Sequence, residues 1–164
     1  MDIFWEELTS GLPNTKQLVQ VIIRLVAAAL LGAIIGIDRE RAGKAAGLRT
    51  HILVTLGTTV FVLAGSGYGM SSEGLSRVIQ GIVTGIGFIG AGSILKLNEE
   101  RYVEGLTTSA GIWMASAIGV AVGLGALGLA ILATILTFIV LKLAMPIENR
   151  IEKERLAKGK DINT

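Results

Sequence analysis

The stretch LTTSAGIWMASAIGVAVGLGALGLAILATILTFIVLKLAM, residues 106–145, decides the fold of this chain. It contains no Asp, Glu, Arg or His, and its single charged residue, Lys142, lies near its end. As one helix it would be roughly 60 Å long, whereas the hydrocarbon core of a bilayer is about 30 Å thick. The stretch is therefore too long for one membrane crossing and suits two, with a turn in the glycine-rich segment 123–128.

The composition of the whole chain also indicates a membrane protein. Of the 164 residues, 51% are hydrophobic and 17% are charged, which is too little charge to cover a soluble domain of this size. The 22 glycines suit close packing of helices in lipid. Because the chain has no cysteine, disulfides, thiolate metal sites and a cysteine nucleophile are excluded.

The apolar runs predict an all-α fold, a polytopic membrane bundle of five transmembrane helices with a glycine-rich third span. Pro146 cannot continue a helical hydrogen-bond ladder, so we expect the fifth span to end there. This gives an N-terminal extracytoplasmic segment at 1–17, a transmembrane domain at 18–146 and a short basic cytoplasmic tail at 147–164. The predicted spans are residues 18–37, 52–68, 78–97, 106–124 and 126–145.

Two clusters of basic residues predict the orientation in the membrane. One cluster follows the first span and the other is the C-terminal tail, so four spans separate them and both lie on the same side. Because basic residues gather on the cytoplasmic side, we expect the N-terminus outside and the C-terminus in the cytoplasm. Acidic residues interrupt the tail and no aromatic residues accompany it, so the expected partner is the lipid bilayer and not nucleic acid. The first cluster consists of Arg39, Arg41, Lys44 and Arg49.

Arg24 is a charged residue inside the first predicted span. An arginine at the centre of a bilayer costs about 2.5–3.5 kcal/mol on insertion scales. Two interpretations remain open. The side chain could extend outward to the lipid headgroups, or it could face a polar cavity or an acidic partner inside the bundle.

The segment after the first span carries a second group of polar candidates, GIDRE at 36–40 and AGLRTH at 46–51. Asp38 and Glu40, with the single histidine His51 nearby, could supply ligands to a hard cation such as Mg²⁺. The alternative is an ordinary charged membrane edge in which Asp and Glu pair with Arg. We favour the second interpretation, so Mg²⁺ is possible and no cofactor is required.

Small residues at helical spacing predict close helix contacts. The fourth span has Gly111, Ala115, Gly119 and Gly123 four residues apart, and the first span has Gly32 and Gly36. The partner of such a face could lie in the same chain or in a second copy, and a homo-oligomer, most simply a dimer, is expected.

The glycines of the third span could act in two ways. Gly81, Gly85 and Gly92 fall near one helix face and favour packing, or the span could be unwound so that its carbonyls face a cation. We favour packing. The segment GIGFIG at 85–90 matches a dinucleotide-binding pattern, but it lies in an apolar run and not between a strand and a helix, so that function is excluded.

Four motifs together resemble the MgtC/SapB family of bacterial inner-membrane proteins. They are GIDRE at 36–40, AGLRTH at 46–51, VTGIGFIGAG at 83–92, and GLTT at 105–108 followed by IW at 112–113 and AIG at 117–119. The resemblance implies a multi-pass protein of the bacterial cytoplasmic membrane, associated with growth under Mg²⁺ limitation, acid stress and, in pathogens, survival inside host cells. It also implies that a polar cluster has a functional role, consisting of Asp38, Arg39, Glu40, Arg49, Thr50 and His51.

Two functions follow from the residues and the resemblance. The first is a non-enzymatic regulator that docks on a membrane ATPase or transporter through its small-residue faces. The second is a small oligomeric transporter of Mg²⁺ or another ion or solute, suggested by Arg24, the charged segment and the glycines of the third span. An enzyme is not expected, because the chain has one histidine and no nucleophile motif of the hydrolase type.

Overall fold

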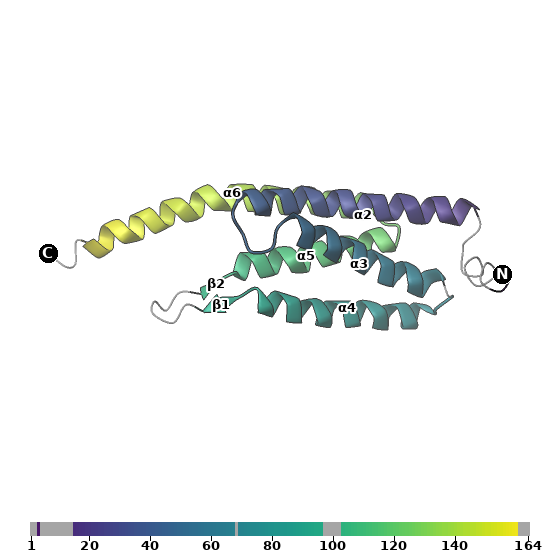
Figure 1. Ribbon diagram of the computed structural model, residues 1–164. Helices are drawn as coiled ribbons and strands as arrows, with labels where there is room; N and C mark the ends of the chain where they lie inside the picture. Colours follow the sequence, from purple (N-terminus) through teal and green to yellow (C-terminus); the bar gives the residue numbers. More distant parts are fainter. Residues whose placement is uncertain (1–2, 4–14, 68, 97–102, 161–164) are drawn as a thin grey trace.

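Five α-helices and one short β-hairpin make up the described part of the chain (Figure 1). The computed structural model describes residues 15–67, 69–96 and 103–160, and residue 3. Most of the predicted N-terminal segment 1–17 and the last residues of the predicted tail lie outside this part. The helices are α2 (Thr15–Arg41), α3 (Leu48–Gly67), α4 (Ser72–Gly92), α5 (Leu106–Gly123) and α6 (Leu127–Lys160).

The lengths and hydropathies of these helices confirm the all-α membrane fold. The helices α2, α3, α4 and α5 are each long and apolar enough to cross a bilayer, and α6 contributes a shorter apolar part, Leu127–Leu143. The turn between α5 and α6 falls in the predicted glycine-rich segment. Gly125 has a φ of +81° there, which a residue with a side chain rarely adopts.

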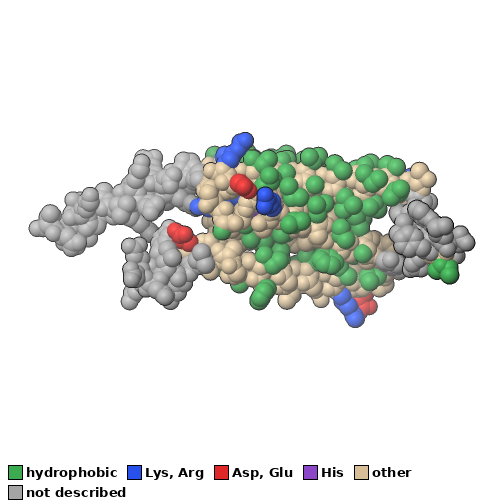
Figure 2. Space-filling model, in the orientation of Figure 1, with side chains coloured by type: hydrophobic (Ala, Val, Ile, Leu, Met, Phe, Trp, Pro, Cys, Tyr) green, Lys and Arg blue, Asp and Glu red, His purple; other side chains and the backbone are tan. Residues whose placement is uncertain are grey.

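Large apolar side chains cover much of the outer surface (Figure 2). Phe88 on α4 is 85% exposed, and Leu53 on α3 is 67% exposed. Continuous apolar surface of this kind is unfavourable in water, whereas lipid tails solvate it and helices satisfy their own backbone hydrogen bonds there. The chain is therefore a multi-pass membrane protein.

Three predicted helix ends are wrong. The helix α4 runs from Ser72 to Gly92 and not over residues 78–97, and residues 95–96 form a strand instead. The helix α2 continues past residue 37 to Arg41, because arginine and glutamate are good helix formers and can extend a helix beyond the apolar core. The helix α6 continues through Pro146 to Lys160, so proline does not end it. An internal proline removes one hydrogen bond but can be accommodated by a bend. Figure 1 shows the C-terminal part of α6 sloping away from the bundle.

A short β-hairpin that the sequence did not predict links α4 to α5. Its strands β1 (Leu95–Lys96) and β2 (Val103–Glu104) pair antiparallel, with Leu95 opposite Glu104 and Lys96 opposite Val103. The hairpin lies at the end of the bundle to which α4 leads (Figure 1). Two residues per strand are too few for an alternating sequence pattern to be visible.

The helices alternate in direction, so the first described helix begins at one end of the bundle and the last finishes at the other (Figure 1). The connection between α2 and α3 and the C-terminal part of α6 lie at the same end. We call this the charged end, since Asp38, Arg39, Arg41, Lys44 and Arg49 lie there. The two basic stretches therefore share one end of the bundle, as an odd number of crossings requires.

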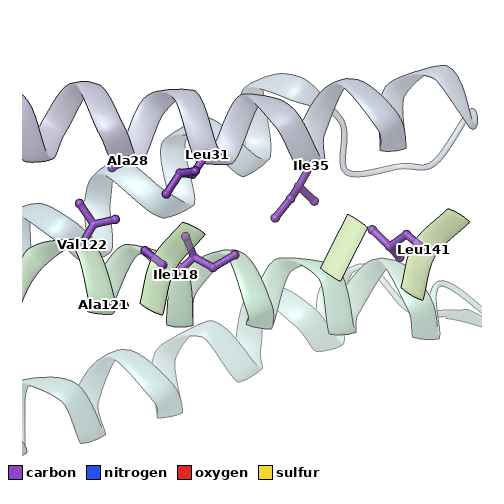
Figure 3. Packing of buried hydrophobic residues seen from close by; sticks show 8 residues of the cluster. Ala28, Leu31, Ile35, Ile118, Ala121, Val122 and Leu141 are labelled. Atoms are coloured by element: carbon purple, nitrogen blue, oxygen red, sulfur yellow. The ribbon is translucent and has the colours of Figure 1, made fainter. Parts of the chain in front are cut away.

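The helix α5 occupies the centre of the bundle. Its span is 56% buried, compared with 11% for the span of α4. Figure 3 shows Leu31 and Ile35 of α2 pointing toward Ile118 and Val122 of α5, with Leu141 of α6 completing the cluster. The core thus lies between α2, α5 and α6, and α4 is the helix with the least cover from its own chain.

Candidate functional site

The small residues of α5 form its contact with α3. An added Cβ on Gly119 would lie 2.5 Å from the carbonyl oxygen of Thr55, and Gly111 and Gly123 also face α3. Ala115, in the same row, is fully buried. The helix that packs against these small residues therefore belongs to the same chain. This face of α5 is not available for docking another protein.

The two glycines of α2 also lie against α3. An added Cβ on Gly32 would lie 2.8 Å from the carbonyl oxygen of His51, and one on Gly36 would lie 2.7 Å from the Cα of Leu48. Distances this short require a neighbour's backbone to move, so only glycine fits. The helix α3 is thus held between α2 and α5 by small residues on both sides.

The glycines of α4 behave differently. In the part of the chain that the structure describes, no atom lies within 4 Å of a Cβ added to Gly81, Gly85 or Gly92. Packing of Gly85 and Gly92 is therefore not found within the chain and stays a prediction for a second copy. The alternative of an unwound span is wrong, because α4 is a continuous helix from Ser72 to Gly92.

A polar face on α3 is buried in the middle of the bundle. His51, Thr55, Thr58 and Thr59 are each at most 6% exposed. Thr55 and Thr58 donate to carbonyls of their own helix, whereas Thr59 Oγ1 donates to the Gly119 carbonyl oxygen at 2.8 Å and links α3 to α5. This face was not predicted from the sequence, although its positions recur at the three- and four-residue spacing of one helix side.

His51 lies at the start of this polar face and has no exposed surface. Its Nδ1 lies 2.9 Å from the Gly47 carbonyl oxygen, so this nitrogen is the donor of the ring. The other nitrogen, Nε2, is buried without a hydrogen-bond partner in the described part and faces Gly111, where an added Cβ would lie 3.4 Å away. A buried polar atom without a partner is uncommon in proteins, so His51 stays a candidate functional residue.

Asp38 and Arg39 form a buried ion pair at the charged end. Arg39 Nη2 donates to Asp38 Oδ2 at 2.5 Å, and both side chains are nearly buried. The Nζ of Lys142, on α6, lies 2.8 Å from the other carboxylate oxygen of Asp38. The contact with Lys142 was not predicted from the sequence, because no spacing rule relates this lysine to Asp38.

Asp38 and Glu40 do not form a joint pair of metal ligands. Residues two apart on a helix face different directions, and both carboxylates have other partners. Asp38 binds Arg39 and Lys142. Glu40 Oε2 accepts a hydrogen bond from the backbone N–H of Leu48 at 2.7 Å, which gives this N–H in the first turn of α3 a partner that its own helix cannot provide. The described residues contain no group of three or more His, Asp and Glu side chains that could hold a metal ion.

The predicted polar cluster is thus only partly brought together. Asp38 and Arg39 contact each other, Glu40 contacts the start of α3, and His51 is buried nearby on α3. Arg49 is exposed and has no ion pair or hydrogen bond with another described residue. Thr50, which follows it, faces α4 across a groove.

Arg24 has a partner that neither of the two interpretations named, and both interpretations stay predictions. Its Nη1 donates to the Gly123 carbonyl oxygen at 2.8 Å, at the C-terminal end of α5. The last carbonyls of a helix have no partner within that helix, and a cation is favourable beside them. The intramembrane charge therefore stabilises the end of a neighbouring helix, next to the turn at Gly125.

Serine hydroxyls join α4 to α5 near the hairpin. Ser109 Oγ donates to the Gly90 carbonyl oxygen and lies 2.8 Å from Ser93 Oγ, and Ser93 Oγ in turn donates to Gly90 at 2.8 Å. These bonds connect the least buried helix to the central one, and Ile86 of α4 also joins a buried cluster with Ile112 of α5. Most of the other residues of α4 are exposed or half-buried and can face lipid or a partner.

Comparison with known proteins identifies the family. The profile of the MgtC family matches residues 25–150. The chain belongs to the MgtC family. This match covers α3, α4 and α5 entirely and reaches into α2 and α6, so the contacts described above lie within the family's region, except that Arg24 stands one residue before it.

Several members of the MgtC family are similar to the chain along most of this region. The putative magnesium transporter YhiD of Escherichia coli is 43% identical over 131 residues, which cover 75% of this chain and 60% of YhiD. The protein SrpB of Synechococcus elongatus is 40% identical, with 72% and 71% covered. The protein MgtC of Salmonella typhimurium is 45% identical, and the match covers 70% of this chain and 48% of MgtC. No solved structure matches the chain significantly.

Proposed function

We propose that the chain is a non-enzymatic regulator of other membrane proteins in the bacterial inner membrane, associated with Mg²⁺ limitation, acid stress or intracellular survival. Its family membership and the family's associations support this proposal. The observation that carries it is that the charges inside the bundle bind one another and the helix ends. Arg24 binds the end of α5, and Asp38 binds Arg39 and Lys142.

A transporter would need polar groups that face a continuous path. The residues that suggested such a path have other partners, and α4 is not broken at its glycines. Neither Arg24 nor Asp38 lines the groove between α3 and α4, which is almost entirely apolar. A regulator needs no such path, because it acts through contact with a second membrane protein.

A reconstitution assay tests this proposal. We would place the purified protein in liposomes that contain a Mg²⁺-sensitive or a pH-sensitive dye and impose a gradient of each ion. A regulator gives the same flux as protein-free liposomes. In parallel, cells lacking the gene should recover growth at low Mg²⁺ when the chain is supplied. Flux well above the protein-free value, with the same dependence on Asp38 as growth, would reject the regulator.

The second candidate is a transporter of Mg²⁺ or another ion or solute. The name of the Escherichia coli relative, putative magnesium transporter, favours it, and so does the unpartnered Nε2 of His51 inside the bundle. The same liposomes distinguish the two functions with His51→Gln, using Arg41→Gln at the membrane surface as the control. A transporter would lose flux in the first variant and keep it in the second.

We also infer that the chain forms a homo-oligomer, most simply a dimer, with α4 at the contact. Gly92 supports this because it lies on a helix that its own chain covers poorly. The chain has no cysteine, so Gly92→Cys provides a single thiol for oxidative cross-linking in native membranes. Gly128→Cys on α6, where an added Cβ also meets nothing within 4 Å, is the control. Equal cross-linking of both variants would contradict a contact through α4.

A further inference from the structure

An open groove of about 610 Å³ lies between α3 and α4 on the outside of the bundle. Its walls are apolar side chains from both helices, among them Leu53, Phe61, Ile82 and Ile89. A pocket of this size and character is typical of sites that take an apolar ligand. In a membrane-spanning chain, the molecules that meet such a groove first are lipids.

Glycines make the groove deep. Gly57 of α3 and Gly81 and Gly85 of α4 line it, and an added Cβ on any of them would have no atom within 4 Å. The glycines of α5 and α2 are different, because their missing side chains let a neighbouring helix approach. Here the missing side chains leave a hollow that nothing in the described part of the chain fills.

The length of the groove corresponds to one leaflet of a bilayer. On α3 it runs from Thr50 to Phe61, a distance of about 17 Å by helical rise. The hydrocarbon core is about 30 Å thick, so the groove covers roughly half of it. One acyl chain of a phospholipid occupies one leaflet, so the groove has the depth that a single acyl chain fills.

The groove begins at the charged end, beside an arginine that has no partner among the described residues. Thr50 is the first groove residue on α3, and Arg49 precedes it in the sequence. Arg49 also lies one helical turn before Leu53, on the same side of α3. It is exposed and makes no ion pair with another described residue, so its guanidinium is available to a group at the mouth of the groove.

We propose that this groove binds an anionic phospholipid. One acyl chain lies between α3 and α4 over the hollow made by Gly81 and Gly85, and the headgroup phosphate accepts hydrogen bonds from Arg49. A guanidinium binds phosphate with charge-assisted hydrogen bonds, often two at once. Two neighbouring features thus define the occupant: an apolar channel of leaflet depth, and at its headgroup end a cation that has no ion pair with another described residue.

Quenching of tryptophan fluorescence by brominated lipids tests the proposal. The protein used as the reference carries Phe61→Trp in the groove, and both of its native tryptophans are replaced by phenylalanine. It is reconstituted into bilayers that contain increasing fractions of either phosphatidylglycerol or phosphatidylcholine brominated on the acyl chain. We expect phosphatidylglycerol to quench at about a fivefold lower fraction, the preference that one basic residue contributes beside an anionic lipid. Equal quenching by the two lipids, or none by either because a second protein fills the groove, would overturn the proposal.

Two pairs of variants separate the headgroup from the acyl chain. Arg49→Gln should remove the fivefold preference, whereas Arg41→Gln, an exposed arginine of the same end on α2, should keep it. Gly85→Leu should fill the hollow and remove the preference, whereas Gly87→Leu should not. Both glycines lie on α4 with nothing within 4 Å of an added Cβ, but only Gly85 lines the groove.

Each of these variants has one outcome that supports the lipid site and one that rejects it. Retention of the preference in Arg49→Gln, or its equal loss in Arg41→Gln, would show a general surface charge effect and reject the site. Retention in Gly85→Leu would place the acyl chain elsewhere. Far-ultraviolet circular dichroism checks that each variant keeps its helices, and Arg49→Gln, which alters an exposed side chain, tests the site even if Gly85→Leu does not fold.

Discussion

Adding one methyl group to the centre of α5 should separate it from α3. In Gly119→Ala the new Cβ would lie 2.5 Å from the Thr55 carbonyl oxygen and 3.0 Å from its Cα, and would also meet Thr58 Oγ1. Two of these atoms belong to the backbone of α3, so no rotation of a side chain relieves the contact. The helices must move apart instead.

The expected loss of stability has three contributions. Overpacking of a tight contact costs about 1–3 kcal/mol. Separation also weakens the hydrogen bond from Thr59 Oγ1 to the Gly119 carbonyl oxygen, worth about 0.6–1.7 kcal/mol between membrane helices. Alanine is a better helix former than glycine by about 1 kcal/mol, which offsets part of the loss. The free energy of unfolding should therefore fall by about 1–4 kcal/mol.

Unfolding in mixed micelles, followed by far-ultraviolet circular dichroism, measures this change. Gly87→Ala is the matched control, because it makes the same substitution in a helix where an added Cβ meets nothing within 4 Å. The control should be as stable as the natural protein or slightly more stable. If Gly119→Ala and Gly87→Ala had the same stability, the close packing of α5 on α3 would be refuted.

Three further predictions concern charges and orientation. Asp38→Asn leaves the nearly buried Arg39 without a carboxylate, so the free energy of unfolding should fall by about 3–5 kcal/mol. Lys142→Met should lower the free energy of unfolding by about 1 kcal/mol at most, because the side chain of Lys142 is more than half exposed. Arg24→Met removes the donor at the end of α5 and should cost about 1–2 kcal/mol in the same micelle assay. Single thiols at positions 45 and 160 should both react with a membrane-impermeant maleimide in inverted vesicles and not in intact cells, since basic segments stay in the cytoplasm.

Each of these predictions has an outcome that contradicts it. A larger loss in Lys142→Met than in Asp38→Asn would mean that Lys142, and not Arg39, is the main partner of Asp38. For Arg24, the control is Arg77→Met, which removes an exposed ion pair with Glu73 and should change stability by less than about 1 kcal/mol. Labelling of positions 45 and 160 from opposite sides would contradict the five-helix topology.

The sequence predicted where the helices and the glycine turn lie, but not which helix each side chain contacts. The apolar runs located the five helices, and the glycine-rich segment located the turn before α6. The end of α6 was misplaced because a proline in a long helix can bend it without ending it. The spacing of Gly111 and Gly119 revealed a contact face, but not whether α3, α4 or a second copy would occupy it.

The candidate site illustrates the same limit. The motif residues Asp38 and Glu40 allowed either a cation site or the favoured pairing with Arg, and in the structure Asp38 pairs with Arg39 while Glu40 contacts the start of α3. The partner of Asp38 on α6, Lys142, had no motif to mark it. The buried threonines of α3 could have been found from their spacing, although threonine in a lipid span is as readily explained by bonds to its own helix.

Hydropathy and residue spacing by themselves determined that this chain crosses a membrane, where it crosses, and which sides of α2 and α5 pack closely. These properties depend on neighbours within one helix, and the sequence contains them directly. Only the tertiary structure decided that Arg24 reaches Gly123, that Asp38 reaches Lys142, and that the glycines of α4 border an open groove. Such pairs lie far apart along the chain, and their contact depends on how several helices pack together, which no local pattern encodes.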